Sequence, residues 1–270
     1  MKESFLEQLL AEHKNSLDCP SPDKITAFYE SLVSFLFPDY GNEKITNKES
    51  LETKYELLQQ EWMTILNQRC KRMQNPAKEN ASALFNKLEN IKIQLEKDVD
   101  AMFSGDPAAK SRIEVVKTYP GFKAIAAHRI AHQIYENGFQ LIARVISEYA
   151  HEKTGVDIHP GAKIGDYFCI DHGTGIVIGE TTEIGEYVKI YQGVTLGATS
   201  VKKEDASTKR HPTIGNHVVI YANATILGGN TIIGEKCIIG GNSWITKSVP
   251  PHTKLYYDSK NKHLEERPVK

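Results

Sequence analysis

An aliphatic residue returns every six positions through most of the stretch from Asp157 to Val249. A small residue often follows it, as in Ile164-Gly165. A period of six fits neither the 3.6-residue repeat of a helix nor the alternation that marks a strand. It is typical of a hexapeptide β-helix, in which three hexapeptides make a rung of roughly 18 residues. The aliphatic positions form two registers, which are Ile158, Ile164, Ile170, Ile176, Val188 and Val194, then Ile214, Ile220, Ile226, Ile232 and Ile238.

This pattern predicts a left-handed parallel β-helix whose aliphatic side chains point inward and stack from rung to rung. Only Thr182 interrupts the first register. About four rungs fit the repeat, which is enough for a continuous core. The segment 198–212 joins the two registers, is polar and lacks the repeat. We expect it to leave the coil as an extruded loop, and such loops often carry function.

The first 155 residues have the periodicity of helices instead. Apolar residues recur at intervals of three and four in the segments 25–36, 51–66 and 84–102. Two more helices are predicted at 119–138 and 141–155, separated at an Asn-Gly pair. Apolar stripes of this kind could hold a cofactor, but packing within a helical bundle is their more common use.

The predicted fold class is therefore α+β, with the helices first and the β-helix after them. We place a helical N-terminal domain at 1–155, and we expect it to mediate oligomerisation and to contribute part of the substrate-binding site. The β-helix domain follows at 156–250 and a polar C-terminal tail at 251–270.

Composition and charge exclude several classes of partner. The net charge is -1, without the basic excess that a nucleic-acid backbone requires. No apolar run approaches the roughly 20 residues needed to span a bilayer. The first residues, MKESFLEQLLAEHK, do not resemble a secretory signal, so we expect a cytoplasmic protein. The 4 cysteines are scattered without a CxxC pair, which favours free thiols over a disulfide framework or a cysteine zinc site.

Two further features have structural interpretations. Asp106 precedes Pro107, and this pair favours the start of a helix. His128 and His132 stand four residues apart, so they share one helical face and could bind a metal. No third ligand lies nearby in the sequence, and packing or a subunit contact is the preferred interpretation.

Three segments are the best candidates for chemistry: GVDIHPGAKIG (155–165), CIDHGTGIVIGET (169–181) and KRHPTIG (209–215). With DPAA at 106–109 and VTLGATS at 194–200, they resemble the serine O-acetyltransferases of bacteria and plants. The resemblance implies transfer of acetyl from acetyl-CoA to the hydroxyl of L-serine, in the synthesis of cysteine. It implies acetyl-CoA as co-substrate, with no prosthetic group and no metal.

Within this resemblance, His172 matches the general base and Asp157 the carboxylate that orients it. A serine hydroxyl is a poor nucleophile at neutral pH, and an imidazole that titrates near pH 6.5 is suited to take its proton. A carboxylate behind the imidazole holds its tautomer and stabilises the imidazolium. The spacing between the two residues predicts neighbouring rungs.

The resemblance also implies which residues bind serine. Asp106, with Pro107, and Asp171 match the groups near the substrate amino group. Arg210 and His211 match those that bind its carboxylate, which a guanidinium can hold with two hydrogen bonds. His211 would also help to stabilise the oxyanion.

Three small residues, Gly197, Ala198 and Ala222, match the family's contacts to CoA. Bulky side chains would obstruct the pantetheine arm there. The chain departs from the family pattern nearby: Ala198 and Tyr221 replace smaller residues, and GGNTIIG at 228–234 is one residue longer than usual.

The resemblance extends to partners and assembly. Family members form trimers with active sites between adjacent β-helices, often paired into hexamers, so we expect a homotrimer or a dimer of trimers. Cysteine is a common feedback inhibitor of the family's enzymes.

Many relatives dock a terminal isoleucine into the active site of O-acetylserine sulfhydrylase. This sequence ends in Lys270, so we expect weak docking or none.

Three other functions fit parts of the pattern. An acyltransferase for a sugar or antibiotic shares the β-helix and the catalytic histidine but leaves the helical domain unexplained. A catalytically silent scaffold has no use for a base and a substrate clamp together. A zinc hydratase on the same repeat needs three histidines that converge between subunits. Its candidate ligands are His159, His172, His211 and His217.

Overall fold

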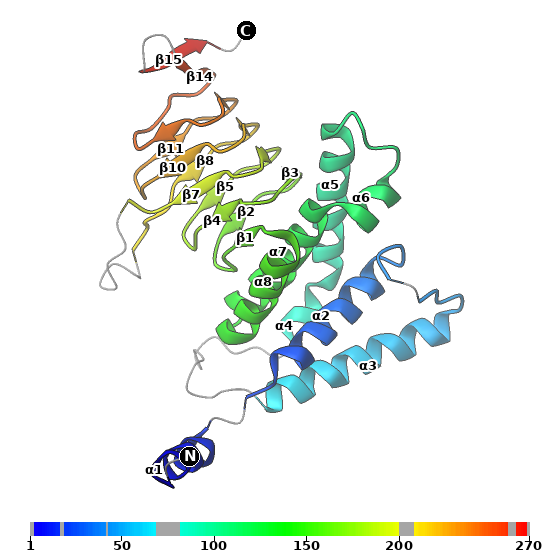
Figure 1. The fold of residues 1–270 in the computed structure, drawn as a ribbon. Helices are drawn as coiled ribbons and strands as arrows, with labels where there is room; N and C mark the ends of the chain where they lie inside the picture. Colours follow the sequence, from blue (N-terminus) through cyan, green and yellow to red (C-terminus); the bar gives the residue numbers. More distant parts are fainter. Residues whose placement is uncertain are drawn as a thin grey trace.

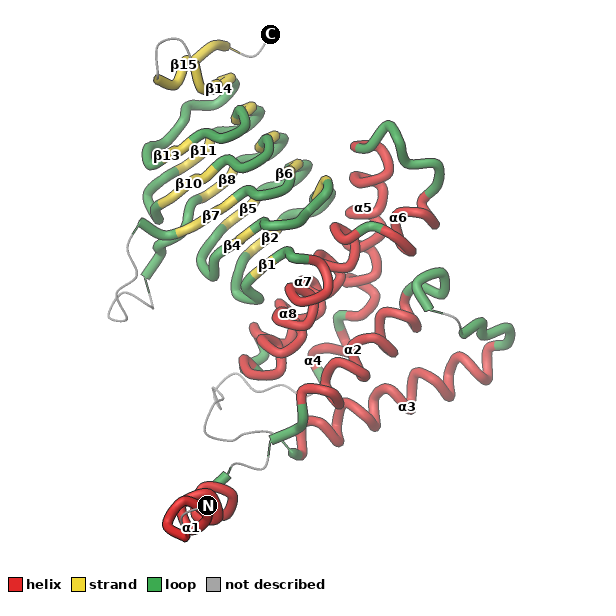
Figure 2. The backbone as a smooth tube through the Cα atoms, viewed as in Figure 1, coloured by secondary structure: helices red, strands yellow, loops and turns green. Residues whose placement is uncertain are grey.

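The computed structural model describes residues 3–16, 19–41, 43–68, 82–199, 208–258 and 263–268. Its helices come first and its strands follow, which confirms the α+β class (Figure 1, Figure 2). The helices are α1 (Glu3–Asn15), α2 (Pro22–Leu36), α3 (Lys48–Asn67), α4 (Ala83–Asn86), α5 (Leu88–Gly105), α6 (Arg112–Thr118), α7 (Pro120–Glu136) and α8 (Gln140–Thr154).

Most helix ends follow the signals in the sequence. α2 begins with a proline, and the hydroxyl of Ser21 accepts a hydrogen bond from the backbone N–H of Lys24. α7 and α8 are separated at Gly138, and α8 is closed by Gly155, which has a left-handed φ of 68°. Local capping chemistry therefore fixed these boundaries.

The interpretation of Asp106 as a helix start is wrong. α5 ends at Gly105 and Asp106 is its C-terminal cap. The next helix, α6, is capped instead by Ser111, whose hydroxyl accepts a hydrogen bond from the backbone N–H of Glu114. Because the Asp106 carboxylate caps no helix start, it is available for another role.

The strands form three sheets, one on each side of the coil. Sheet A contains β1 (Asp157–Ile158), β4 (Val177–Ile178), β7 (Thr195–Gly197), β10 (Thr225–Leu227) and β13 (Trp244–Ile245). Sheet B contains β2 (Lys163–Ile164), β5 (Glu183–Ile184), β8 (Thr213–Ile214) and β11 (Ile232–Ile233). Sheet C contains β3 (Cys169–Asp171), β6 (Lys189–Tyr191), β9 (Val219–Ile220), β12 (Ile238–Ile239), β14 (Thr253–Asp258) and β15 (His263–Pro268).

The chain visits the sheets in turn, which confirms the parallel β-helix. Successive strands of a sheet pair in parallel, as β1 pairs with β4 through Asp157 and Val177. Sheet A has 5 strands, one more than the four rungs expected from the repeat. Residues 200–207 of the expected extruded loop lie outside the described residues.

The inward register holds up to Ile226 and then shifts by one residue. The aliphatic positions of both registers are buried as far as Ile226, and Thr182 is buried among them. Beyond that point Ile232 is 52% exposed while Ile233 is fully buried. The expectation that Ile232 points inward is therefore wrong, because the extra residue of the GGNTIIG segment moves the repeat by one position.

Part of the predicted tail is structured. β14 extends sheet C by pairing in parallel with β12, and β15 pairs with β14 in antiparallel orientation. Leu255 of β14 is buried. Residues 259–262 and 269–270, including the Lys270 considered for partner docking, lie outside the described residues.

A buried ion pair joins the helices to the first rung of the β-helix. The guanidinium of Arg129 on α7 lies 3.0 Å from the carboxylate of Asp98 on α5, and both side chains are almost fully buried. Arg129 also donates to the carbonyl oxygens of Ile164 and Gly165, and Asp98 accepts from the backbone N–H of Phe168. Burial raises the pKa of Asp98, and Arg129 opposes that shift.

The cysteines are not all free. Cys19 is disulfide-bonded, contrary to the expectation of free thiols, whereas the buried Cys169 and Cys237 are free. Within the described ranges, no helix combines the length and the apolar character that crossing a bilayer requires. The expected cytoplasmic location stays a prediction.

We predict that Asp98→Ala strongly destabilises the protein, because it leaves the Arg129 guanidinium buried without its counter-charge. The expected loss in the free energy of unfolding is about 3–5 kcal/mol. Urea unfolding followed by circular dichroism measures it. Lys48→Ala at the exposed start of α3, which removes an exposed ion pair with Glu52, is the control and should cost about 0.5 kcal/mol. Equal losses in the two variants would contradict a central role for Asp98.

We also predict that stability falls as the pH drops from about 6.5 to 5, partly through His128. Burial holds the pKa of His128 well below its usual value, so the unfolded chain binds a proton in this range that the folded chain does not. His128→Leu should recover about 2 kcal/mol of the stability lost at pH 5 relative to pH 7. Replacing the exposed His13 by Gln is the control. An unchanged pH dependence in His128→Leu would refute this assignment.

Candidate active site

Two edges of the β-helix carry most of the candidate residues. The first edge is the turn between β3 and β4, where sheet C meets sheet A, and it holds Asp171 and His172. The second edge is the turn between β4 and β5, where sheet A meets sheet B, and it holds Glu180 and Thr181. β4 separates them, so the edges lie on opposite sides of sheet A.

His172 projects from the first edge. Its φ of 60° is left-handed, and Gly173 follows with a φ of 92°. A Cβ on Gly173 would lie 3.1 Å from a methyl carbon of Val156, so the turn needs glycine there. The imidazole is 70% exposed, and its Nε2 lies 3.6 Å from a carboxylate oxygen of Asp171. The turn therefore presents an accessible imidazole with a carboxylate beside it.

Asp106 reaches the same edge from the end of α5. One of its carboxylate oxygens accepts a hydrogen bond of 2.5 Å from the hydroxyl of Tyr119, and the other accepts from the backbone N–H of Ala108. The Tyr119 hydrogen bond, with that of Ala108, lowers the pKa of Asp106. The same contact raises the pKa of Tyr119 to about 12. Pro107 follows at the surface, and the loop presents an ionised carboxylate.

Lys189, on β6, joins these groups and was not anticipated from the sequence. Its Nζ lies 2.8 Å from the Asp171 carboxylate and donates to the carbonyl oxygen of Gly105 at 2.7 Å. The pairing of Cys169 with Lys189, 20 residues apart, sets this position. A rung of roughly 18 residues would have misplaced it, so only the observed register identifies the contact.

The second edge holds Arg210 and His211 through Thr181. The Thr181 hydroxyl accepts hydrogen bonds from the backbone N–H groups of both residues. The Arg210 guanidinium pairs with Glu180, which also accepts from the hydroxyl of Tyr135. A cavity of about 300 Å³ opens beside Glu180 and Thr181.

His211 has a defined tautomer. The backbone N–H of Thr181 donates to its Nδ1 at 3.1 Å, so the ring proton is on Nε2. Burial, with the nearby charge of Arg210, lowers the pKa of His211 to about 4. A Cβ at Gly179 would lie 2.1 Å from the His211 ring, so only glycine leaves room for it. At neutral pH the ring is an uncharged hydrogen-bond donor.

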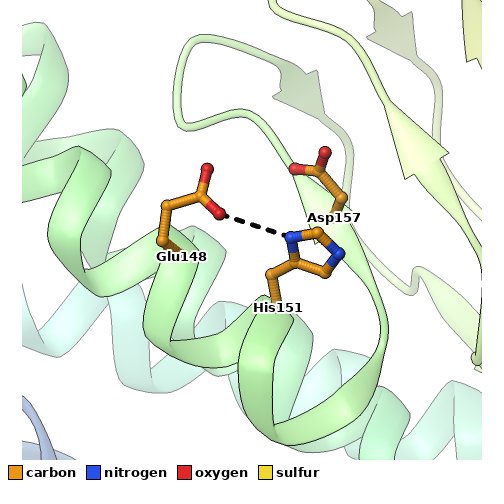
Figure 3. Close-up of side chains that lie close together, drawn as sticks. All are labelled: Glu148, His151 and Asp157. Carbon is orange, nitrogen blue, oxygen red and sulfur yellow. Dashed lines mark hydrogen bonds and ion pairs between the residues drawn. The ribbon is translucent and has the colours of Figure 1, made fainter.

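Asp157 lies beside α8 rather than in a hydrogen bond with His172. Ligand atoms of Glu148, His151 and Asp157 lie within 4.8 Å of one another (Figure 3). The Nδ1 of His151 is 3.3 Å from a carboxylate oxygen of Glu148. Between the described side chains of Asp157 and His172 no hydrogen bond forms, and the orienting role of Asp157 stays a prediction.

The cluster in Figure 3 offers two carboxylates and one imidazole, a set of ligands that could suit a divalent cation. Glu148, however, already pairs with Arg144, and both Glu148 and His151 are close to half exposed. The histidines considered for a zinc hydratase have other partners: His159 accepts from Gly161 and His217 stacks on Tyr187.

The expected CoA contacts are divided between the two edges. Gly197 is the last residue of β7, and Ala198 follows it. β7 lies two rungs along sheet A from β1, so these two residues are on the side of the second edge. Ala222 follows β9 on the side of the first edge. Nearby, Tyr221 is exposed and stacks on Tyr191 at 5.0 Å.

The structure thus brings together Asp106, Asp171 and His172 at the first edge, and Arg210 with His211 at the second. It does not bring these two groups together within one chain. Sequence reasoning missed Lys189, Tyr119 and Glu180, of which only Glu180 lies inside a motif that had been singled out.

Comparison with known proteins identifies relatives, although no family model matches the chain. A plasmid-encoded serine acetyltransferase of Synechococcus elongatus is 50% identical over 179 residues, which is 64% of this chain and 56% of that protein. The serine acetyltransferase of Staphylococcus epidermidis is 49% identical over 160 residues, 59% of this chain and 73% of that protein. The match therefore spans a little over half of the first relative and about three quarters of the second.

Solved structures agree with these sequence matches. Serine acetyltransferase isoform 3 from Entamoeba histolytica, in complex with cysteine, has a TM-score of 0.75 and 37% identity. The likeness covers 85% of this chain and 80% of that one, and it confirms the left-handed hand of the β-helix. Soybean serine acetyltransferase has a TM-score of 0.59 and 28% identity over 93% of this chain. The chain belongs to the serine acetyltransferase family.

Proposed function

We propose that this protein transfers the acetyl group of acetyl-CoA to the hydroxyl of L-serine, giving O-acetyl-L-serine and CoA. The observation that carries the proposal is the grouping of Asp106, Asp171 and His172 at one edge of the β-helix, in a chain that is 49% identical to a serine acetyltransferase over 160 residues. Acetyl-CoA is the co-substrate in this reaction, and the chemistry requires no prosthetic group.

His172 is the general base. Its exposed ring takes the proton of the serine hydroxyl as the oxygen attacks the thioester carbonyl carbon. The tetrahedral intermediate then collapses, the carbon–sulfur bond breaks and CoA leaves as a thiolate, which is protonated by the imidazolium or by water. A thiol pKa of roughly 8.5 makes this leaving group a good one. Asp157 takes the role of the carboxylate that orients the imidazole, which rests on its match to the family pattern.

The two edges bind opposite ends of serine. Asp106 and Asp171 hold the substrate ammonium at the first edge, with Pro107 shaping the loop beside them. Arg210 binds the carboxylate, and the Nε2–H of His211 donates to the developing oxyanion. The lowered pKa of His211 keeps that donor uncharged across the neutral range.

A complete site then requires two copies of the chain. β4 and its two flanking turns separate the edges, so we infer that one serine molecule does not contact both edges of the same chain. A closed trimer places the first edge of one copy against the second edge of the next. The same junction brings Ala222 to face Gly197 and Ala198, which supports a CoA groove between copies. Pairing of trimers into a hexamer is a further proposal.

Cysteine is a candidate inhibitor at the serine site, because it differs from serine by one atom and a solved relative contains it.

We predict that free-thiol release from acetyl-CoA requires L-serine and His172. His172→Asn should lower kcat by about 10³-fold, since general-base assistance of this kind contributes about 10²–10⁴-fold. D-serine, homoserine and simple sugars should release little thiol, and mass spectrometry should detect O-acetylserine. His13→Asn serves as the matched control. A preference for a sugar, or full activity in His172→Asn, would contradict the proposal.

We further predict that two inactive variants restore each other's activity. His172→Ala and Arg210→Ala are each inactive alone, but subunits unfolded and refolded together in equal amounts form mixed trimers. If every site combines one residue from each neighbour, about one quarter of the sites regain both residues. A mixture with no more activity than its components would place His172 and Arg210 of one site on the same chain.

A further inference from the structure

We propose that Lys189 is a positioning residue for acetyl transfer, which joins the loop carrying Asp106 to Asp171 and offsets the charge of one of these carboxylates beside His172. This inference rests on the proposed function of the first edge. Lys189 lies outside the segments whose pattern pointed to chemistry, and its role follows from its contacts.

The first step is geometric. The side chain of Lys189 is only 18% exposed, and Asp171, its ion-pair partner at 2.8 Å, is 16% exposed. The same ammonium donates to the carbonyl oxygen of Gly105 at 2.7 Å and lies 4.6 Å from the ring centroid of Tyr191. One cation thus connects β3, β6 and the C-terminal end of α5.

The contact with Gly105 bears directly on Asp106. The last four carbonyl groups of a helix lack partners within it, and a cation near the helix C-terminus is favourable. Lys189 supplies both the donor and the charge at the residue that precedes Asp106. The backbone that precedes Asp106 is therefore fixed to the β-helix. The carboxylates of Asp106 and Asp171 are then held at a defined separation for the ammonium of serine.

The second step is electrostatic. The titratable groups near His172 and Lys189 are Asp106 and Tyr119 from the helices, Cys169 and Asp171 from β3, and Tyr191 from β6. At neutral pH the charges among them are two carboxylates and one ammonium. Partial burial acts to lower the pKa of Lys189, but the hydrogen bonds to Asp171 and Tyr191 outweigh it and raise that pKa, so the lysine stays cationic.

Removing the ammonium would leave two unbalanced carboxylates around the imidazole. Neighbouring negative charge favours imidazolium, and a protonated His172 cannot accept the serine proton. Lys189 therefore leaves the first edge one net negative charge for the substrate ammonium and limits the negative charge that the imidazole faces. A purely structural lysine would have no such effect on the base.

The test compares Lys189→Met, Lys189→Gln and Lys189→Arg with wild type and with the exposed control Lys247→Met, in the complete chain. Thiol release is measured from pH 5.5 to 9 with serine and acetyl-CoA varied separately. In Lys189→Met and Lys189→Gln we expect kcat/KM for serine to fall about 10–100-fold while the KM for acetyl-CoA changes less than about 2-fold. The acid limb of the pH profile should move up by about one pH unit.

Lys189→Arg keeps the charge, so its acid limb should stay at the wild-type position even if its geometry lowers kcat. An unmoved acid limb in both neutral variants would overturn the inference. A KM for acetyl-CoA that rises as much as the KM for serine would do so as well, since it indicates a general disturbance of the site. Circular dichroism and sedimentation show whether a variant is misfolded. If either Lys189→Met or Lys189→Gln is misfolded, the pH profile of the other one tests the inference. A wild-type protein without serine acetylation would overturn the proposed function instead.

Discussion

The buried pair of Asp98 and Arg129 is the interaction on which the rest of the molecule depends. It satisfies two carbonyl groups and one N–H group of the first rung, which no further rung covers from that side. A buried ion pair of this kind is costly to break and fixes one arrangement of the elements that contribute to it. α5 and α7 therefore dock on the β-helix in one register, and the C-terminal end of α5 comes to lie beside β3. The position of Asp106 follows from that docking.

The rungs determine the rest of the site. Because each rung has three short strands, the coil has edges where two sheets meet. The turns at these edges carry side chains that project away from the coil. The first edge, which carries His172, and the second edge, which holds Arg210, lie on opposite sides of sheet A, so the two residues face in different directions. If serine is the substrate, as we propose, a complete site takes residues from two copies of the chain. Oligomerisation, on this account, completes the active site and adds more than stability.

Much of this could be predicted from the sequence. The period of six predicted the β-helix, and apolar spacings of three and four predicted the helices, because both signals are local. The inward position of Ile232 was predicted wrongly, since one added residue moves every later side chain. Asp106 was interpreted as a helix start because a carboxylate before proline has that local preference. In the structure Asp106 instead follows the last residue of α5. Lys189 could not be found at all, since its contacts depend on a 20-residue rung and on packing between distant segments.

The most direct test of the central claim is an experimental structure of the full chain with L-serine bound. The account predicts the serine ammonium between Asp106 and Asp171 of one copy, with its hydroxyl facing His172. The serine carboxylate should lie on Arg210 of a neighbouring copy. Serine held by both edges of a single chain, or bound away from His172, would contradict the account.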